Sequence, residues 1–285
     1  MATIVGFGAC HRDVVGRLSA PAEAASVPGR TTTYRGGAAF NVLRHVAAAG
    51  HPSMLVTPHL PPSPPEGLTV ASLGEPSGEE PSGEEPSYTA ILDESGELIV
   101  ALSDMEAYEC IRTEQMDEWA GALQDANRVL VDANLPEAVI GRARSLRDGG
   151  PIDALCVSPS KAVRLVPLQG AIGTLFANTR EAVALCGHES DASTLARSLV
   201  EWGCRQAVVT DGPRACGVAD ADNVWSLDAP RVNDLRDVTG AGDAVAGGTL
   251  AALEDGVPLP EAVKRGLALA GQVVTVDGPA LPLAA

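Results

Sequence analysis

The segment from Asp237 to Asp243 has the composition of an anion-binding loop. It reads Asp-Val-Thr-Gly-Ala-Gly-Asp, and the small and apolar residues that follow it as far as Gly256 predict a helix that begins inside the loop. Small residues let backbone N–H groups approach an anion closely, and a helix N-terminus adds unpaired donors and a positive dipole end. In the first turn, Asp243 would either cap the helix or accept the proton of an attacking hydroxyl, and the spacing alone favours neither role.

The chemistry that such a loop supports is phosphoryl transfer. The backbone N–H groups of Gly240, Ala241 and Gly242 would stabilise charge on the transferring group while Asp243 acts as the catalytic base. The loop is not a Walker A sequence, because no Gly-Lys-Ser/Thr follows its glycines. Near the N-terminus, Gly-Phe-Gly at 6–8 lacks the third glycine of a dinucleotide-binding fingerprint, so we discount that motif.

These residues need a framework of strands and helices to position them. Short, nearly continuous apolar runs predict buried parallel strands at 3–8, 128–132, 154–157, 174–177 and 207–210. Amphipathic patterns predict helices at 113–126, 136–147 and 192–202. This alternation predicts an α/β fold with a doubly wound, mostly parallel sheet flanked by helices, and 285 residues suit a single domain.

Two stretches interrupt the alternation. Residues 88–92 and 98–102, joined by a polar turn that contains Gly96, predict a β-hairpin that would act as a lid. Residues 58–87 are rich in Pro, Gly, Ser and Glu and carry Ser-Gly-Glu-Glu-Pro twice, at 77–81 and 82–86. This composition buries too little apolar area to offset the conformational entropy of the chain, so we predict a flexible loop there.

Charge and composition exclude several classes of protein. With 20 Lys and Arg against 37 Asp and Glu, the formal net charge of -17 opposes binding to nucleic acid or to an anionic membrane surface. The six cysteines lack the close spacing of a zinc site, and free thiols are favoured over disulfides. The N-terminus lacks the features of a signal peptide, and no apolar run is long enough to span a bilayer. We therefore expect a soluble, cytoplasmic protein whose partner is a small molecule.

The loop at 237–243 closely resembles the C-terminal signature Asp-Thr-x-Gly-Ala-Gly-Asp of the ribokinase-like (PfkB) carbohydrate kinases. In that family the last aspartate is the base and the preceding loop is the anion hole. The resemblance therefore implies these roles for Asp243 and for Gly240, Ala241 and Gly242. Val238 replaces the usual threonine of the signature, a change that removes no catalytic group.

Residues nearer the N-terminus match the family's substrate-binding positions. The sequence Gly-Gly-Ala-Ala-Phe-Asn at 36–41 resembles the signature Gly-Gly-x-x-x-Asn. The resemblance implies that Gly36, Gly37 and Asn41 hold substrate hydroxyls, and that Asp13 binds the sugar hydroxyls. It also implies a ribokinase-like fold with a small β lid from about 9–36 and 88–104, through which two copies would form a homodimer.

Other positions match the family's contacts to ATP. Asn-Thr-Arg-Glu at 178–181 matches an Asn-x-x-Glu motif that acts on Mg²⁺ and the ATP phosphates largely through water, although such a sequence is also a common helix start. Thr-Asp-Gly at 210–212 stands where a Thr-x-Gly motif approaches the nucleotide. The implied ATP-side residues are Asn178, Glu181, Thr210, Gly212 and Thr239, with Glu181 serving Mg²⁺ through water and Asp237 lying nearest to a K⁺ ion.

Three further segments resemble the pseudouridine kinases within this family. They are residues 88–109, Val-Asp-Ala-Asn-Leu-Pro at 131–136, and Val-Ser-Pro-Ser-Lys-Ala-Val-Arg-Leu at 157–165. The resemblance implies transfer of the γ-phosphoryl of ATP to the 5′-hydroxyl of pseudouridine, with Asn134 and Lys161 on the substrate side. Asn134 is equally explained as a turn residue before Pro136, and Lys161 as a solvated lysine at a helix start.

The sequence departs from the family at two places that bear on the substrate. The helix that usually follows the second core strand is missing, because residues 54–56 run into the Pro-rich stretch. Phe40 stands where pseudouridine kinases often have arginine. Two alternatives therefore stay open: a kinase of the same family for another nucleoside or a ribose-like sugar, and a non-catalytic nucleoside-binding regulatory protein.

Overall fold

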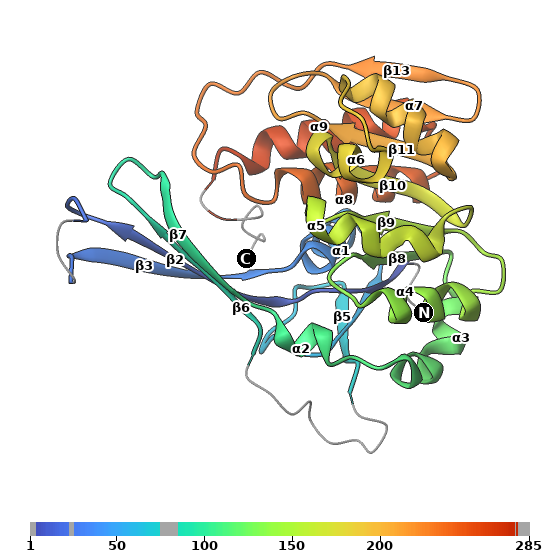
Figure 1. The fold of residues 1–285 in the computed structure, drawn as a ribbon, viewed down its shortest axis with the longest axis horizontal. Helices are drawn as coiled ribbons and strands as arrows, with labels where there is room; N and C mark the ends of the chain where they lie inside the picture. Colours follow the sequence, from blue (N-terminus) through green and yellow to red (C-terminus); the bar gives the residue numbers. More distant parts are fainter. Residues whose placement is uncertain (1–3, 23–25, 75–84, 277, 279–285) are drawn as a thin grey trace.

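The framework is a nine-stranded sheet with the order β13-β12-β11-β10-β9-β8-β1-β4-β5 (Figure 1). The computed structural model describes residues 4–22, 26–74, 85–276 and 278. Neighbouring strands run parallel from β11 to β5, and β12 and β13 are antiparallel additions at one edge. The strands are β1 (Ile4–Phe7), β4 (Ser53–Thr57), β5 (Leu68–Ser72), β8 (Arg128–Asp132), β9 (Ile152–Leu155), β10 (Ile172–Asn178), β11 (Cys204–Thr210), β12 (Cys216–Asp220) and β13 (Val224–Leu227).

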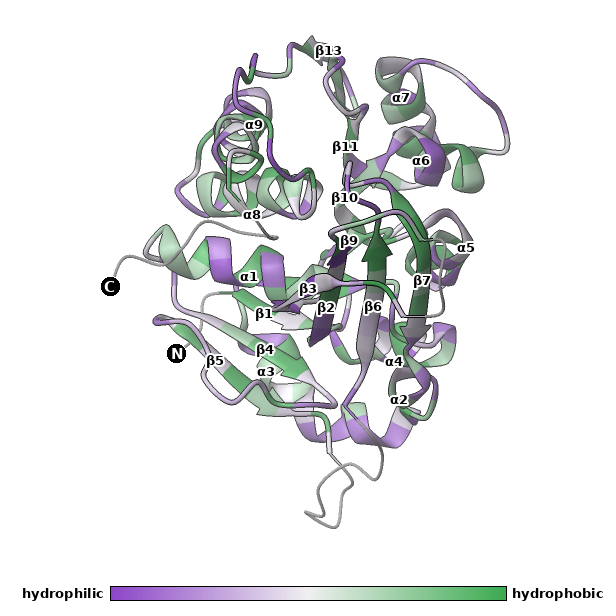
Figure 2. Ribbon diagram, turned by 90° about the vertical axis from the view of Figure 1, so that its left-hand side faces the viewer, coloured by the Kyte–Doolittle hydropathy of each residue, from purple (hydrophilic) through white to green (hydrophobic). Residues whose placement is uncertain are grey.

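Helices cover both faces of this sheet (Figure 2). One face carries α1 (Ala38–Ala48), α8 (Ala241–Glu254) and α9 (Leu259–Val273). The other carries α3 (Ala120–Asp125), α4 (Glu137–Leu146), α5 (Pro159–Ala162), α6 (Thr179–Cys186) and α7 (Ala192–Trp202), with 3₁₀ turns at Thr113–Trp119 and Val163–Leu168. Each face therefore has its own hydrophobic core, and the central strands are buried from both sides.

Close packing of α8 against α9 depends on glycine. A Cβ atom on Gly248 would lie 2.8 Å from the Cα atom of Gly266, and one on Gly266 would lie 2.3 Å from the carbonyl oxygen of Val245. Only residues without a side chain let the two helix backbones approach this closely. The small residues that follow Asp243 in the sequence therefore determine how closely α8 packs against α9.

A second, four-stranded sheet projects from the body of the molecule (Figure 1). Its order is β3-β2-β6-β7, and its strands are β2 (His11–Leu18), β3 (Gly29–Gly36), β6 (Ser87–Leu92) and β7 (Leu98–Asp104). The segments that we predict to form a lid supply these strands, and β6 and β7 form the predicted antiparallel hairpin. After β7 the chain returns to the body through α2 (Glu106–Glu109).

Most predicted elements are present, and the α/β class with a mostly parallel central sheet is confirmed. The predicted helix at 192–202 coincides with α7, whereas the one at 113–126 is a 3₁₀ turn followed by the short α3. The prediction of a loop across 58–87 is wrong in part, because Leu68–Ser72 forms strand β5 parallel to β4. Residues 58–67 contain no helix, in agreement with the prediction that the helix after the second core strand is missing. Residues 75–84 lie outside the described part of the chain.

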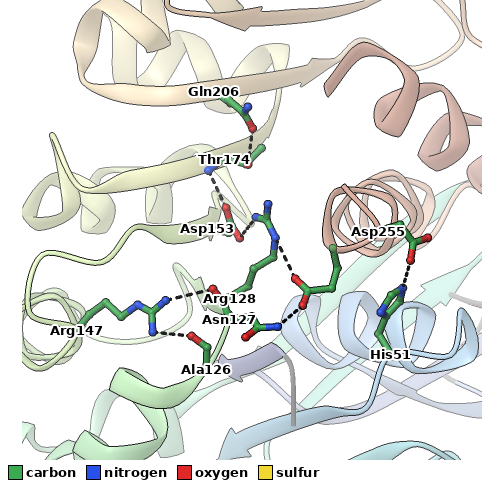
Figure 3. A network of polar contacts seen from close by, with 10 residues as sticks. His51, Ala126, Asn127, Arg128, Arg147, Asp153, Thr174, Gln206 and Asp255 are labelled. Atoms are coloured by element: carbon green, nitrogen blue, oxygen red, sulfur yellow. Dashed lines mark hydrogen bonds and ion pairs between the residues drawn. The ribbon is translucent and has the colours of Figure 1, made fainter. Parts of the chain in front are cut away.

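A polar network ties the amino ends of the central strands together (Figure 3). Arg128 Nη1 donates to Asp153 Oδ2 at 2.8 Å, and Asp153 Oδ1 accepts from the Thr174 backbone N–H at 2.8 Å. Glu254, at the end of α8, pairs with Arg128 and accepts from Asn127 Nδ2. This network lies at the edge of the sheet opposite to the carboxyl ends of the parallel strands. No helix in the described ranges has the length and apolarity that crossing a membrane requires.

Candidate active site

A cleft of about 900 Å³ opens at the carboxyl ends of β9, β10 and β11, beside the start of α8. Open α/β sheets bind their ligands at this edge, because the loops that follow the strands diverge there. The cleft brings together residues that lie far apart in the chain, from Ala38 to Val274. Seven of the predicted site residues line it: Asn178, Glu181, Thr210, Gly212, Ala241, Gly242 and Asp243.

Asp243 lies in the first turn of α8 and points toward another helix. Its Oδ2 accepts a hydrogen bond from Asn41 Nδ2 of α1 at 2.9 Å, and no side chain caps the first turn of α8. Burial raises the pKa of Asp243 to about 7. Nearby Asp132 and Glu181 act in the same direction as burial, whereas the bond from Asn41 and the neighbouring His11 act against it. A carboxylate with a pKa near neutrality is suited to exchange protons with a hydroxyl.

The loop before Asp243 has the geometry of an anion hole. Gly240 adopts a φ of 77°, in the left-handed region that favours glycine, and α8 starts at the next residue. The first backbone N–H groups of a helix have no partner within the helix. Here the Ala241 N–H donates to the Val238 carbonyl oxygen at 3.2 Å, whereas those of Gly240 and Gly242 have no backbone acceptor among the described residues and can turn toward a phosphoryl group. Asp237 supports the loop, because its Oδ1 accepts from the Thr239 N–H at 2.8 Å and its Oδ2 from the Gly278 N–H at 3.2 Å.

Asn178 and Glu181 are at once a helix start and part of the cleft. Asn178 Oδ1 accepts from the Glu181 N–H at 3.0 Å, and Glu181 Oε2 accepts from the Asn178 N–H at 2.9 Å, so that α6 begins with a capping box. Burial raises the pKa of Glu181. The cap uses one oxygen of the Glu181 carboxylate among the described residues, which leaves the other oxygen suited to a water ligand of Mg²⁺.

The remaining residues that we predict on the nucleotide side divide into two groups. Thr210 and Gly212 border the cleft at the end of β11, whereas Thr239 is exposed and does not line it. Arg214, which sequence reasoning missed, also borders the cleft and donates to both carboxylate oxygens of Asp211, at 2.5 and 2.7 Å. The guanidinium is thus paired with the Asp211 carboxylate beside the cleft, and no local sequence pattern distinguishes Arg214 from other surface arginines.

Two glycines make room for the predicted acceptor-binding aspartate. His11 Nε2 lies 3.1 Å from Asp13 Oδ1, and a Cβ atom on Gly36 would lie 1.9 Å from Asp13 Oδ2. Gly37 has a φ of 109°, and a Cβ atom there would lie 2.2 Å from the carbonyl oxygen of Ala9. Both positions therefore exclude larger residues, and they bring Asp13 on β2 next to the start of α1, which carries Asn41.

Asn134 and Lys161, which we also predict on the acceptor side, contact each other. Lys161 Nζ donates to Asn134 Oδ1 at 2.6 Å, and Arg164 Nη1 donates to the Asn134 carbonyl oxygen at 3.2 Å. Burial lowers the pKa of Lys161, and the negative charge of Asp132 opposes that shift. Lys161 is thus a half-buried cation in contact with Asn134, not a solvated lysine. None of Asp13, Gly36, Gly37, Asn41, Asn134 and Lys161 lines the large cleft itself; the bond from Asn41 to Asp243 joins the two groups.

Val157 contributes backbone strain at the wall of the cleft. It follows β9 with a φ of 66°, and the Ser158 N–H donates to the Cys156 carbonyl oxygen at 2.7 Å across it. A β-branched residue rarely adopts this conformation, and tight turns of this kind are strained. Strain of about 1–3 kcal/mol persists where the surrounding structure enforces it, commonly in functional sites. Nothing in the sequence around Val157 signals it.

An open parallel sheet, a glycine-rich helix start with a buried carboxylate at its carboxyl edge, and a small projecting sheet form the arrangement expected of a phosphotransferase. The chain belongs to the pfkB family of carbohydrate kinases, whose family model matches residues 80–285. Kinases of this family transfer a phosphoryl group to a hydroxyl of a sugar or nucleoside.

Individual relatives support this membership. The chain is 27% identical over 276 residues to the pseudouridine kinase of Escherichia coli (strain K12), covering 92% of this chain and 87% of the relative. A carbohydrate kinase from Agrobacterium tumefaciens superposes with a TM-score of 0.81 at 30% identity, covering 98% of this chain and 93% of that one. The ribokinase of Arabidopsis thaliana complexed with ribose and ATP has a TM-score of 0.78 at 16% identity, covering 98% and 94% of the chains, and shares the fold.

Proposed function

We propose that this kinase transfers the γ-phosphoryl group of ATP to the 5′-hydroxyl of pseudouridine. The observation that carries the proposal is the Asn41–Asp243 hydrogen bond, which joins the predicted acceptor side to the anion-binding loop of α8. The E. coli pseudouridine kinase, which aligns with 92% of this chain, supports this acceptor.

Asp243 would remove the proton from the attacking hydroxyl. Its carboxylate lies between the residues that line the cleft and the predicted acceptor-binding residues, and its raised pKa suits proton exchange. The N–H groups of Gly240, Ala241 and Gly242 would stabilise the charge on the transferring phosphoryl group. Asp13 and Asn41 would orient the acceptor. When bound, Mg²⁺ neutralises phosphate charge, and Glu181, through water, is the residue suited to hold it. A K⁺ ion beside Asp237 stays a prediction, which activity in KCl compared with NaCl tests.

A substrate panel tests the acceptor. Purified protein with Mg-ATP should phosphorylate pseudouridine with a higher kcat/KM than uridine, cytidine or ribose. Cytidine belongs in the panel because a cytidine kinase of Thermococcus kodakarensis is 39% identical over 101 residues, 35% of this chain and 36% of the relative. If one of the other acceptors has the highest kcat/KM, the acceptor assignment is wrong while the phosphoryl-transfer chemistry stands.

The regulatory alternative, a nucleoside-binding protein without activity, is not favoured by any feature of the site. Asp243, Asn178 and Glu181 are present and line one cleft. If this protein bound pseudouridine but consumed no ATP with any acceptor of the panel, the regulatory alternative would be correct.

The projecting sheet supports a homodimer, in which a second copy covers β7. Every residue of β7 is exposed, and after the register shift at its start Val100 and Leu102 share one face of it, with 57% and 70% of their surface accessible. Much of the β7 ribbon has the colour of hydrophobic residues in Figure 2. We place the enzyme in the cytoplasm, because the reaction consumes ATP and all six cysteines are free thiols.

A further inference from the structure

The buried carboxylate of Asp132 does not line the cleft, but it joins three chain segments on the predicted acceptor side of the site. Asp132 ends strand β8 and is completely buried. Its Oδ2 accepts from the backbone N–H groups of Ala9, at 2.8 Å, and Ala39, at 3.1 Å, and its Oδ1 accepts from that of Asn134, at 2.9 Å. No cation pairs with it among the described residues, so these three donors compensate its charge.

Each of the three donors belongs to a segment that carries a predicted acceptor-binding residue. Ala9 precedes β2, which holds Asp13, and Ala39 lies in the first turn of α1, two residues before Asn41. The third donor is Asn134 itself. Because the three bonds converge on one carboxylate, they determine how these segments lie relative to one another.

The surroundings of Asp132 are built for this contact. A Cβ atom on Gly8 would lie 2.5 Å from the Asp132 carboxylate and 2.8 Å from the Cβ atom of Ala39, so only glycine lets the three segments meet. The charge of Asp132 also acts on Asp243 and Lys161, whose pKa values it raises. It therefore lies within electrostatic reach of both sides of the predicted reaction.

Tyr108 holds the backbone of Cys10, the residue after Ala9, through two hydrogen bonds. Its ring is completely buried, and its hydroxyl accepts from the Cys10 N–H at 3.0 Å and donates to the Cys10 carbonyl oxygen at 2.7 Å. Cys10 is the last residue before β2, and Tyr108 lies in α2, directly after β7. One side chain thus joins the strand that enters the projecting sheet to the segment that leaves it.

We infer that Asp132 is a positioning residue for the acceptor side of the site, and that Tyr108 supports it by holding the root of the projecting sheet. The inference rests on the proposed function, in that it takes Asp13, Asn41 and Asn134 to hold the acceptor. Asp132 acts only through the backbone of these segments and touches no substrate.

The Asp132→Asn variant tests the inference with pseudouridine as the probe. An amide keeps one acceptor oxygen but turns an NH₂ group toward at least one backbone N–H, so at least one of the three bonds is lost. We expect the KM for pseudouridine to rise about tenfold or more, because small displacements of bound reactants are costly, while the KM for ATP changes less than about twofold.

Asp153→Asn is the matched control. Asp153 is also buried and accepts a backbone N–H, that of Thr174, but it lies at the opposite ends of the strands, in the network of Figure 3. We expect this variant to melt at a lower temperature while both KM values stay within about twofold of the wild type. Tyr108→Phe, which removes only a hydroxyl, is a second test if Asp132→Asn does not fold, and it should raise the KM for pseudouridine by about threefold.

Amide hydrogen exchange separates a failure of this inference from a failure of the proposed function. Asp132→Asn should speed exchange in residues 8–14 and 37–44 relative to Asp153→Asn, whichever acceptor the enzyme uses. If the wild type prefers another acceptor of the panel, that compound replaces pseudouridine as the probe. The inference is overturned if Asp132→Asn leaves the acceptor KM unchanged, raises both KM values equally, or leaves exchange in these segments like that of the control.

Discussion

At the scale of single residues, the proposed chemistry depends on Asp243, whose environment differs from that of a surface aspartate. Asn41 donates to its carboxylate, and burial together with nearby negative charge raises its pKa to about 7. The sequence alone left a cap and a base equally open. The side chain bonds across to α1, which favours the base.

Replacing this carboxylate should remove turnover and spare binding. We expect Asp243→Asn to lower kcat by a factor of about 10² to 10⁴, because an amide cannot accept the proton of the hydroxyl. Affinity for ATP, measured by calorimetry, should change little, since the loop N–H groups and Glu181 are untouched. Wild-type turnover in this variant would show that another group is the base.

The pH dependence of activity follows from the raised pKa. The base is active only when ionised, so kcat/KM should fall about tenfold for each pH unit below about 7. A profile of kcat/KM between pH 5.5 and 8.5, with the stability of the protein checked at each pH, measures this fall on the acid side. If kcat/KM began to fall only near pH 4, Asp243 would titrate as an ordinary aspartate.

The same raised pKa predicts an effect on stability. The folded protein binds the Asp243 proton more tightly than the unfolded chain, so this proton's contribution to stability is present at acid pH and is lost as pH rises through about 7. Asp243→Asn removes the buried charge. It should therefore melt a few degrees above the wild type at pH 8, with a smaller difference at pH 5.5. Equal melting temperatures at pH 8 would contradict this account of the site.

At the scale of elements, the position of α8 depends on its contact with α9. Gly266→Ala would place a Cβ atom 2.3 Å from the Val245 carbonyl oxygen, so we expect it to destabilise the fold by about 1–3 kcal/mol and to lower kcat, because α8 carries Asp243. Denaturant unfolding measures the first effect and a steady-state assay the second.

Gly141→Ala is the control for that prediction. Gly141 lies in α4, where a new Cβ atom would meet the Pro167 Cβ at an ordinary 3.5 Å. This variant should be neutral or more stable by about 0.5–1 kcal/mol, because alanine has the higher helix propensity. If both variants lose the same stability, glycine is not required by the α8–α9 contact.

At the scale of the whole molecule, the exposed apolar face of β7 predicts self-association. Val100→Glu should shift the protein from dimer to monomer in sedimentation experiments, because a charge beside Leu102 on the exposed face of β7 would be buried in the dimer. Val224→Glu changes an exposed valine, 41% accessible, in β13 at the edge of the nine-stranded sheet, and should leave the mass unchanged. A monomeric wild-type protein would contradict the proposed dimer.

The sequence by itself determined the class of fold and the local machinery. Runs such as 128–132 predict central strands, because a parallel strand buried on both faces is apolar throughout. The loop at 237–243 predicts an anion-binding helix start, because its residues are adjacent in the chain. Strand β5 was missed, since its five residues follow a Pro-rich stretch and only pairing with β4 stabilises them as a strand.

Only the tertiary structure decided how the parts of the site meet. Asp243 contacts Asn41, which lies 202 positions away, and Asp132 holds backbone groups 123 and 93 positions away. Local periodicity and propensity describe neighbours along the chain and contain no information on such pairs. The aspartate that ends β8 was visible in the sequence, but its role depends on three segments that only the folded sheet brings together.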